Sequence, residues 1–196
     1  MTKKTGFTLI ELLVVVSIIL ISVGVAGDLV VSIVRTYNKT RILNEIEQNG
    51  NYVLAKIEYD LRNALTISPA LQNCSTATSS NLTITQRDAA NNTITIDYRL
   101  SNTPESGIGS CSSNCTFAVQ RSTDQTNFYS MINSNLKEGV QIVQASTPLP
   151  GFCLISSDPQ TIRIHFDLVQ APSSPGGKAN QATQAFERIV VTRFID

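Results

Sequence analysis

Tryptophan is absent from the 196 residues, histidine occurs once, and charged residues make up only 15% of the chain. A single histidine excludes a metal site built from several imidazole groups. Lysine and arginine together number 15, as do aspartate and glutamate, so the formal net charge is zero. A nucleic-acid binder needs a basic surplus on one face, and the composition therefore argues against that class. The length fits one globular domain with an appendage, or two small domains at most.

The apolar residues are concentrated near the N-terminus. After the basic Lys3 and Lys4, residues 7–27 form a run of 21 residues with one charge, Glu11. A helix of this length spans roughly 30 Å, the thickness of the hydrocarbon core of a bilayer. Because both lysines precede the run and Asp28 is the first charge after it, the positive-inside rule predicts a cytoplasmic N-terminus. We therefore expect one transmembrane segment, with the rest of the chain outside the cytoplasm.

Glu11 is unusual in such a segment, because an ionised carboxylate there costs on the order of 3 kcal/mol or more. Two interpretations follow from this residue alone. Glu11 either lies close enough to the membrane boundary to reach the headgroups, or it has a functional partner of opposite charge.

The residues around Glu11 form a longer pattern. After a short basic leader, residues 6–11 read Gly-Phe-Thr-Leu-Ile-Glu at the head of the apolar run. This string resembles the processing signal of type IV pilins and the related pseudopilins. The resemblance implies that a prepilin peptidase cuts between Gly6 and Phe7 and N-methylates Phe7. It also implies that Glu11 pairs with the N-terminal amine of an adjacent subunit as a filament grows. Cleavage after Gly6 would create an α-amine that can offset this buried charge.

An ordinary secretory signal peptide is the alternative. The basic leader, the apolar stretch Leu12–Ala26 and the small-x-small sequence at 24–26 provide its elements. The chain would then be a secreted, adhesin-like or tethered domain whose N-terminus lies near Gly27. The charge of Glu11 and the intact six-residue string argue against this alternative.

A helical pattern continues beyond the apolar run. Apolar residues spaced for one face of a helix predict an amphipathic segment as far as Leu65. Gly50 falls on this stripe and indicates a bend or close packing. No proline occurs before Pro69, so residues 7–65 are predicted to form one helix roughly 90 Å long. The stripe comprises Ile42, Ile46, Val53, Ile57, Leu61 and Ala64 or Leu65, and the ion pairs expected on the solvent face are Arg41–Glu45, Lys56–Asp60 and Glu58–Arg62.

The remainder of the chain has strand signals. A Ser-, Thr- and Asn-rich loop at 68–81 precedes alternating apolar residues, which predict an antiparallel sheet with one solvated face. A turn is expected at 87–92. The six predicted strands lie around Leu82–Ile84, Ile94–Leu100, Phe117–Val119, Val140–Val143, Ile162–Leu168 and Phe186–Ile195.

The order of these elements resembles the J-type minor pseudopilins and W-type minor pilins. The resemblance rests on Tyr52–Asn63 as the end of the helix and on Ile94–Leu100 and Ile189–Phe194 as hairpin strands. The insertion at 106–114 is particular to this chain. The expected fold is α+β, a pilin-like ladle with one long helix packed on an antiparallel head. Its parts are a leader at 1–6, a transmembrane half at 7–27, an amphipathic half at 28–65 and a head at 66–196.

Four cysteines follow the predicted membrane segment: Cys74, Cys111, Cys115 and Cys153. Their even number and extracytoplasmic location predict two disulfides, with three possible connectivities. We favour Cys111–Cys115 closing a small loop and Cys74–Cys153 joining the helix exit to the last third of the head. A four-cysteine zinc site is disfavoured, because the spacing is not that of paired Cys-x₂-Cys motifs.

The sequence has no recognisable catalytic motif. It lacks a Gly-x-Ser-x-Gly elbow, a phosphate-binding glycine loop and a calcium loop. His165 lies on the alternate face of its predicted strand, where we expect it to face solvent. We therefore expect no enzyme activity, no cofactor and no metal.

The resemblance implies a minor pilin or pseudopilin. The expected partners are prepilin peptidase, other pilins or pseudopilins and the inner membrane. The expected location is the cytoplasmic membrane before assembly, and afterwards a surface pilus or a periplasmic pseudopilus of the type II secretion kind.

Overall fold

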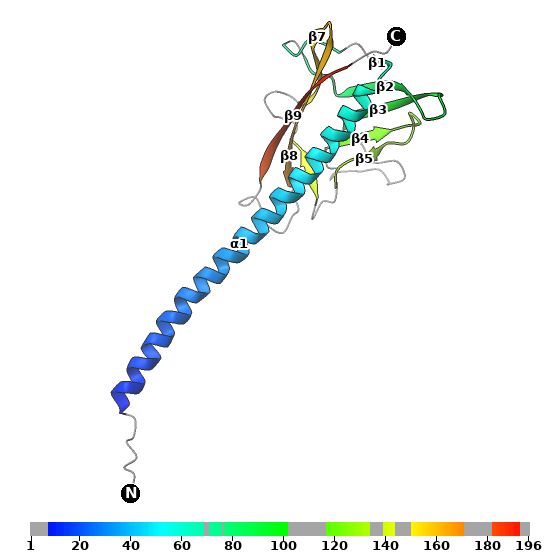
Figure 1. Ribbon diagram of the computed structural model, residues 1–196. Helices are drawn as coiled ribbons and strands as arrows, with labels where there is room; N and C mark the ends of the chain where they lie inside the picture. Colours follow the sequence, from blue (N-terminus) through cyan, green and yellow to red (C-terminus); the bar gives the residue numbers. More distant parts are fainter. Residues whose placement is uncertain are drawn as a thin grey trace. The chain divides into compact units, whose positions relative to one another are not determined.

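The computed structural model describes residues 8–68, 71–75, 77–101, 117–133, 139–143, 150–170 and 182–192. The chain forms two compact units, Met1–Arg41 and Ile42–Asp196. The first helix, α1 (Leu9–Arg62), contributes to both of them (Figure 1). One long N-terminal helix and antiparallel sheets make an α+β fold, as the sequence predicts.

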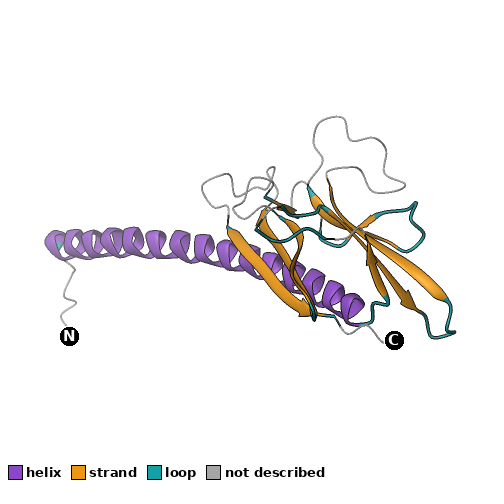
Figure 2. Cartoon of the chain, turned by 90° about the horizontal axis from the view of Figure 1, so that it is seen from above, coloured by secondary structure: helices purple, strands orange, loops and turns teal. Residues whose placement is uncertain are grey.

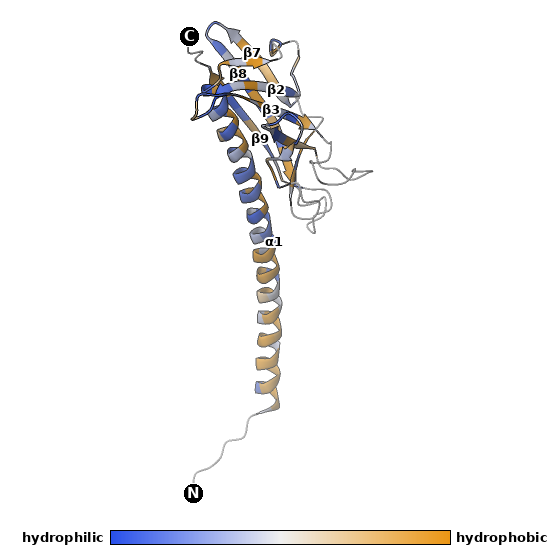
Figure 3. Ribbon diagram, turned by 90° about the vertical axis from the view of Figure 1, so that its right-hand side faces the viewer, coloured by the Kyte–Doolittle hydropathy of each residue, from blue (hydrophilic) through white to orange (hydrophobic). Residues whose placement is uncertain are grey.

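In the first unit, residues 12–27 of α1 include no charged side chain, and the lower part of the helix is mostly orange, the hydrophobic colour, in Figure 3. Its hydroxyl side chains do not interrupt the helix, because they donate hydrogen bonds to the carbonyl four residues earlier. Ser17 Oγ lies 2.8 Å from the Leu13 oxygen, and Ser22 Oγ lies 2.8 Å from the Ile18 oxygen. These polar groups therefore need no water.

In the second unit, the predicted apolar stripe of α1 is confirmed. Ile46, Val53, Ile57 and Leu61 are fully buried in the core of the head, and Figure 2 shows strands lying along this end of the helix. Gly50 provides close packing: a methyl group there would occupy the position of the Phe186 ring. Two of the predicted ion pairs are present: Lys56–Asp60 at 3.2 Å and Arg62–Glu58 at 2.7 Å. The side chain of Glu45 accepts a hydrogen bond from Asn133.

Two sheets cover this part of the helix, where the sequence predicted one. The first has the order β1-β2-β3-β4-β5, and in the second β8 pairs with β6, β7 and β9. Strands β1, β5 and β7 were not predicted. The strands of the first sheet are β1 (Thr66–Ser68), β2 (Asn81–Arg87), β3 (Thr93–Ser101), β4 (Ala118–Ser122) and β5 (Tyr129–Ser130); those of the second are β6 (Val140–Ile142), β7 (Gly151–Ser157), β8 (Gln160–Gln170) and β9 (Thr183–Val191).

The β2–β3 hairpin is confirmed with its turn after Arg87. The Asp88 carboxylate accepts hydrogen bonds from the backbone amides of Asn92 and Ala90, and Asn91 has a positive φ of 65°. These bonds, with that from Asn92 first, lower the pKa of Asp88 below its ordinary value. The local chemistry of Asp and Asn thus determines this turn.

Two residues of the expected loop at 68–81 pair with β7 instead. Asn73 and Ser79 form bridges with Leu154 and Phe152. Gly151 has a φ of 155°, and a Cβ atom there would lie 2.7 Å from the Ser79 carbonyl oxygen. Glycine is therefore required where this segment crosses β7.

Candidate functional site

The start of α1 is stabilised by its own side chains. Thr8 Oγ1 lies 3.4 Å from the Glu11 amide, and a Glu11 carboxylate oxygen lies 3.3 Å from the Thr8 amide. This reciprocal arrangement is a capping box, in which the first residue and the one three positions later satisfy each other's backbone amides. Glu11 therefore has a structural role within its own chain. Gly6 and Phe7 lie outside the described residues.

Beyond this cap, α1 presents an apolar surface. Every large aliphatic side chain from Leu9 to Val34 is at least 46% exposed. The helix includes an 18-residue window that is long and apolar enough to cross a membrane, and none of that window is buried within the protein. An exposed surface of this extent requires lipid or other protein around it.

A comparison with known families supports this interpretation. Residues 1–27 match the model of the prokaryotic N-terminal methylation motif. The chain thus carries a type IV pilin-like prepilin signal on a single-pass, membrane-anchored precursor. The signal indicates a structural subunit rather than an enzyme. No curated protein and no solved structure matches the chain.

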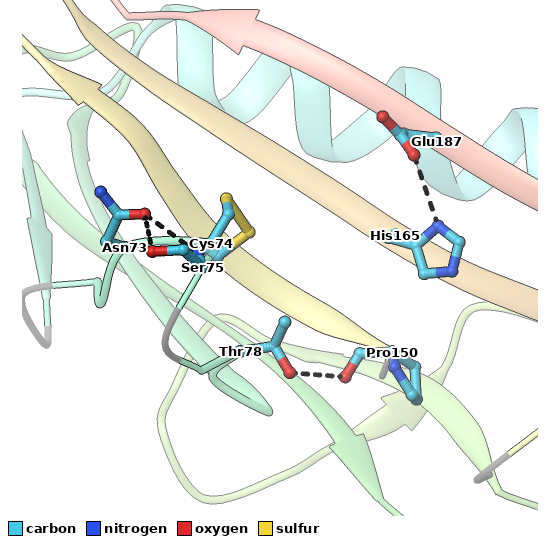
Figure 4. The surroundings of a disulfide bond; sticks show 8 residues. Asn73, Cys74, Ser75, Thr78, Pro150, His165 and Glu187 are labelled. Carbon is cyan, nitrogen blue, oxygen red and sulfur yellow. Dashed lines mark hydrogen bonds and ion pairs between the residues drawn. A yellow bond between two sulfur atoms is a disulfide. The ribbon is translucent and has the colours of Figure 1, made fainter. Parts of the chain in front are cut away.

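The head that follows the prepilin signal contains a disulfide between Cys74 and Cys153 (Figure 4). This is the pairing that the sequence favoured, and the two cysteines are 79 residues apart. In the chain-entropy model, closing a loop of that length stabilises the folded state by about 4 kcal/mol. Cys111 and Cys115 lie outside the described residues, so their pairing stays a prediction.

A buried ionic cluster connects α1 to the first sheet. Asp60 is fully buried, although the sequence placed it on the solvent face of the helix. The hydroxyl of Tyr98 on β3 donates a hydrogen bond to Asp60 Oδ2, and Arg121 Nη2 on β4 lies 3.3 Å from the same oxygen. Lys56 Nζ lies 3.2 Å from Oδ1. Burial, followed by the hydrogen bond to Asp60, raises the pKa of Tyr98 well above its ordinary value.

This buried cluster was not predicted from the sequence, because an acid four residues after a lysine is typical of an exposed ion pair on a helix. The position of Asp60 in the sequence nevertheless indicates burial. Asp60 falls three residues after Ile57 and next to Leu61, on the apolar side of the helix. A charge in that position needs partners from the covering strands.

His165 is not exposed to solvent, which corrects the expectation from sequence. It lies on the predicted face of β8 but is only 6% exposed. Because β8 has strands on both of its edges, neighbouring side chains shield it. Glu187 Oε2 lies 3.7 Å from His165 Nδ1 (Figure 4), and Asp167 Oδ1 lies 3.6 Å from Nε2.

The two carboxylates approach opposite nitrogens of the His165 ring, so they do not converge on one point. Within the described part of the chain, no group of three or more His, Cys, Asp or Glu side chains could hold a metal ion. The candidate functional site is therefore the N-terminal segment with its exposed helix.

Proposed function

We propose that the chain is the precursor of a minor pilin or pseudopilin. Prepilin peptidase cuts it between Gly6 and Phe7 and N-methylates Phe7. The mature subunit then leaves the inner membrane and joins other pilins or pseudopilins in a type IV pilus or a type II secretion-like pseudopilus. The match of residues 1–27 to the methylation motif is the observation that carries this proposal.

The exposed half of α1 supports assembly. A helix that is apolar on all sides is stable in a bilayer or surrounded by similar helices. The filament interior provides the second environment, so the same surface serves the subunit before and after assembly. The head has a core of its own, in which side chains of α1 pack with those of both sheets.

Glu11 has two partners in this proposal. In the precursor its carboxylate caps the helix through Thr8, at distances of 3.3 Å. In the filament it pairs with the α-amine of Phe7 on a neighbouring subunit. The capping bonds are long for charge-assisted bonds, so a full positive charge is the better partner in a low-dielectric bundle.

Mass spectrometry of the membrane-extracted protein tests the processing step. We expect a chain that begins at monomethylated Phe7. The variant Gly6→Leu should keep the full leader and remain in the membrane, because the peptidase needs close access to the backbone at this position. Gly24→Leu is a matched control, since its residue has no neighbour within 4 Å and should not affect the cut.

The same measurement tests the secretory alternative. Cleavage by an ordinary signal peptidase would give an N-terminus near Gly27 and would contradict the pilin assignment. Residues 24–26 lie inside one continuous helix, Leu9–Arg62, and this cut would divide it. That observation supports the pilin interpretation over the secreted one.

A further inference from the structure

A hollow of about 360 Å³ opens on the head where α1 meets β4 and β5. Its walls include Tyr52 and Lys56 from the helix, and Arg121, Tyr129 and Met131 from the sheet side. All of these belong to the second unit, and none of them has a role in the prepilin signal. The volume is sufficient for one amino-acid side chain with its terminal group.

The hollow has a positive charge. Lys56 and Arg121 both contact the buried carboxylate of Asp60, at 3.2 and 3.3 Å. Two cations facing one anion leave a net charge of +1. The side chains of Lys56 and Arg121 are 33% and 25% exposed, whereas that of Asp60 is not exposed at all. The unneutralised charge therefore faces the hollow.

Both cations retain hydrogen-bonding capacity. Arg121 uses Nε and Nη2 for Asp60 and Tyr98, and within the described residues its Nη1 has no partner. Lys56 Nζ reaches one carboxylate oxygen and lies 5.0 Å from the centre of the Tyr59 ring. Because an ammonium group has three donors, at least one is available to a ligand.

Asp60 holds the two cations in place before any ligand arrives. It is fixed by the Tyr98 hydroxyl, which is itself buried. Positioning Lys56 and Arg121 in advance lowers the conformational entropy that a ligand must overcome. Burying Asp60 costs desolvation free energy, but it holds the two cations at the surface in the positions that an anion would need.

The rim of the hollow is aromatic. Tyr52 is 59% exposed and Tyr129 is 58% exposed. Exposed tyrosines next to an arginine are typical of the energetically important centre of protein interfaces. Their rings can cover the aliphatic stem of an inserted side chain while their hydroxyls stay in water.

We propose that this hollow binds a single carboxylate, presented by an acidic side chain of a neighbouring subunit in the filament. A net charge of +1 suits a monoanion better than a phosphate dianion. The exposed tyrosine rim favours a protein-borne carboxylate over a free metabolite. The inference rests on the proposed function only for the identity of the partner as a filament subunit.

The two methionines of the chain, Met1 and Met131, give a direct probe. Methyl-¹³C-methionine labelling of the full-length chain in detergent micelles yields two signals, of which that of Met131 reports on the hollow. Titration with N-acetyl-glutamate methylamide should shift the Met131 signal to saturation. The glutamine analogue, which has the same shape without the charge, should leave it unchanged at equal concentration.

The variant Lys56→Gln should weaken this binding about tenfold, because it removes one charge-assisted contact. Arg62→Gln is the matched control: it removes a cation from the same helix that pairs with Glu58 away from the hollow. The affinity of Arg62→Gln for the glutamate analogue should equal that of the wild type. Thermal unfolding of both variants checks that each is folded. Tyr129→Leu is a second variant, which removes an aromatic ring from the rim of the hollow.

Three results would contradict the proposed carboxylate site. The first is a Met131 signal that does not shift to saturation with the glutamate analogue, and the second is an equal shift with the glutamine analogue. The third is tighter binding of inorganic phosphate than of the glutamate analogue. Affinity that is unaffected by both Lys56→Gln and Tyr129→Leu in folded protein would also overturn it.

Photo-crosslinking in cells tests the partner. A crosslinking phenylalanine analogue at position 129 should capture a subunit peptide that contains Asp or Glu, and Lys56→Gln should reduce the yield at least fivefold. The same analogue at position 19, in the exposed apolar half, reports assembly independently. Crosslinks at 19 without any at 129 would contradict the hollow alone, and their absence at both positions would contradict the proposed function with it. A captured peptide without an acidic residue would also contradict the inference.

Discussion

The two halves of α1 have the same secondary structure but differ in what stabilises them. In the first half, large aliphatic side chains such as Ile19 are more than half exposed, at 54%. In the second half, the equivalent side chains, such as Ile57, are fully buried. The second half therefore obtains its stability from its own head, whereas the first half depends on a bilayer or on other subunits. The chain thus combines a head with its own buried core and a helix surface that still needs a partner.

The largest effect on assembly is expected at Glu11, the charged residue near the start of the exposed part of α1. Glu11→Gln can still accept the capping bond of Thr8 but cannot form an ion pair with an amine. We expect filament incorporation to fall about a hundredfold, since an unpaired amine in an apolar bundle costs about 3 kcal/mol or more. The measurement is the ratio of subunit in sheared filaments to subunit in membranes.

Glu11→Asp is the companion variant, because it keeps the charge and shortens its reach by one methylene group. An intermediate ratio would indicate pairing that depends on distance. If Glu11→Gln assembled like the wild type, helix capping would be the only role of this residue. The proposed ion pair with the Phe7 amine of a neighbouring subunit would then be wrong.

A pair of matched substitutions tests the comparison directly. Ile57→Ala should lower the free energy of head unfolding by about 2 kcal/mol or more, because it leaves a cavity between α1 and the sheets. Ile19→Ala removes the same atoms from the exposed half and should leave that free energy unchanged. Chemical denaturation of the detergent-solubilised chain measures both. Similar losses from the two variants would mean that the halves are not independent.

The smallest effect concerns pH and the buried phenol of Tyr98. Burial and the hydrogen bond to Asp60 raise its pKa, so the folded state keeps the neutral form when the unfolded chain ionises near pH 10. This stabilisation is complete below pH 10 and is lost as the pH rises above it, at up to about 1.4 kcal/mol per pH unit. Tyr98→Phe should give a flatter stability curve between pH 10 and about 11.5 and should cost about 1 kcal/mol at neutral pH.

Tyr37 is the control for this prediction, because it lies in the part of α1 that belongs to the first unit and is 69% exposed. Tyr37→Phe should leave the slope at alkaline pH as it is in the wild type. A slope that Tyr98→Phe does not alter would show that the phenol of Tyr98 ionises as readily in the folded head as in the unfolded chain.

Periodicity in the sequence predicted the elements that have one buried face. The helix stripe from Ile42 to Leu61 has apolar residues at every third or fourth position, and strands β3 and β8 alternate between apolar and polar residues. The structure has these elements at nearly the expected positions. Strand β7 gave no such signal because Gly151, Phe152 and Cys153 are all buried, although successive strand residues face opposite sides of the sheet. Strands β1 and β5 are too short, at three and two residues, to produce a pattern.

The candidate site was predictable only where it is a local motif. The prepilin signal is contiguous in the sequence, and so is the capping pair of Thr8 and Glu11. The cluster around Asp60 is assembled from α1, β3 and β4, so the partners of Asp60 could not be identified without the fold. The burial of His165 likewise depends on the strands on either side of β8.

The contact of Gly50 with Phe186 has a consequence for synthesis. These residues are separated by 136 positions, so the helix surface at Gly50 stays uncovered until the last strand has been made. At about 5–20 residues per second, the delay is roughly 7–27 s. Early hairpins such as β2–β3 can form during that time, but the helix cannot be enclosed. A chain that ends before β9 therefore lacks Phe186, and its helix surface at Gly50 remains exposed.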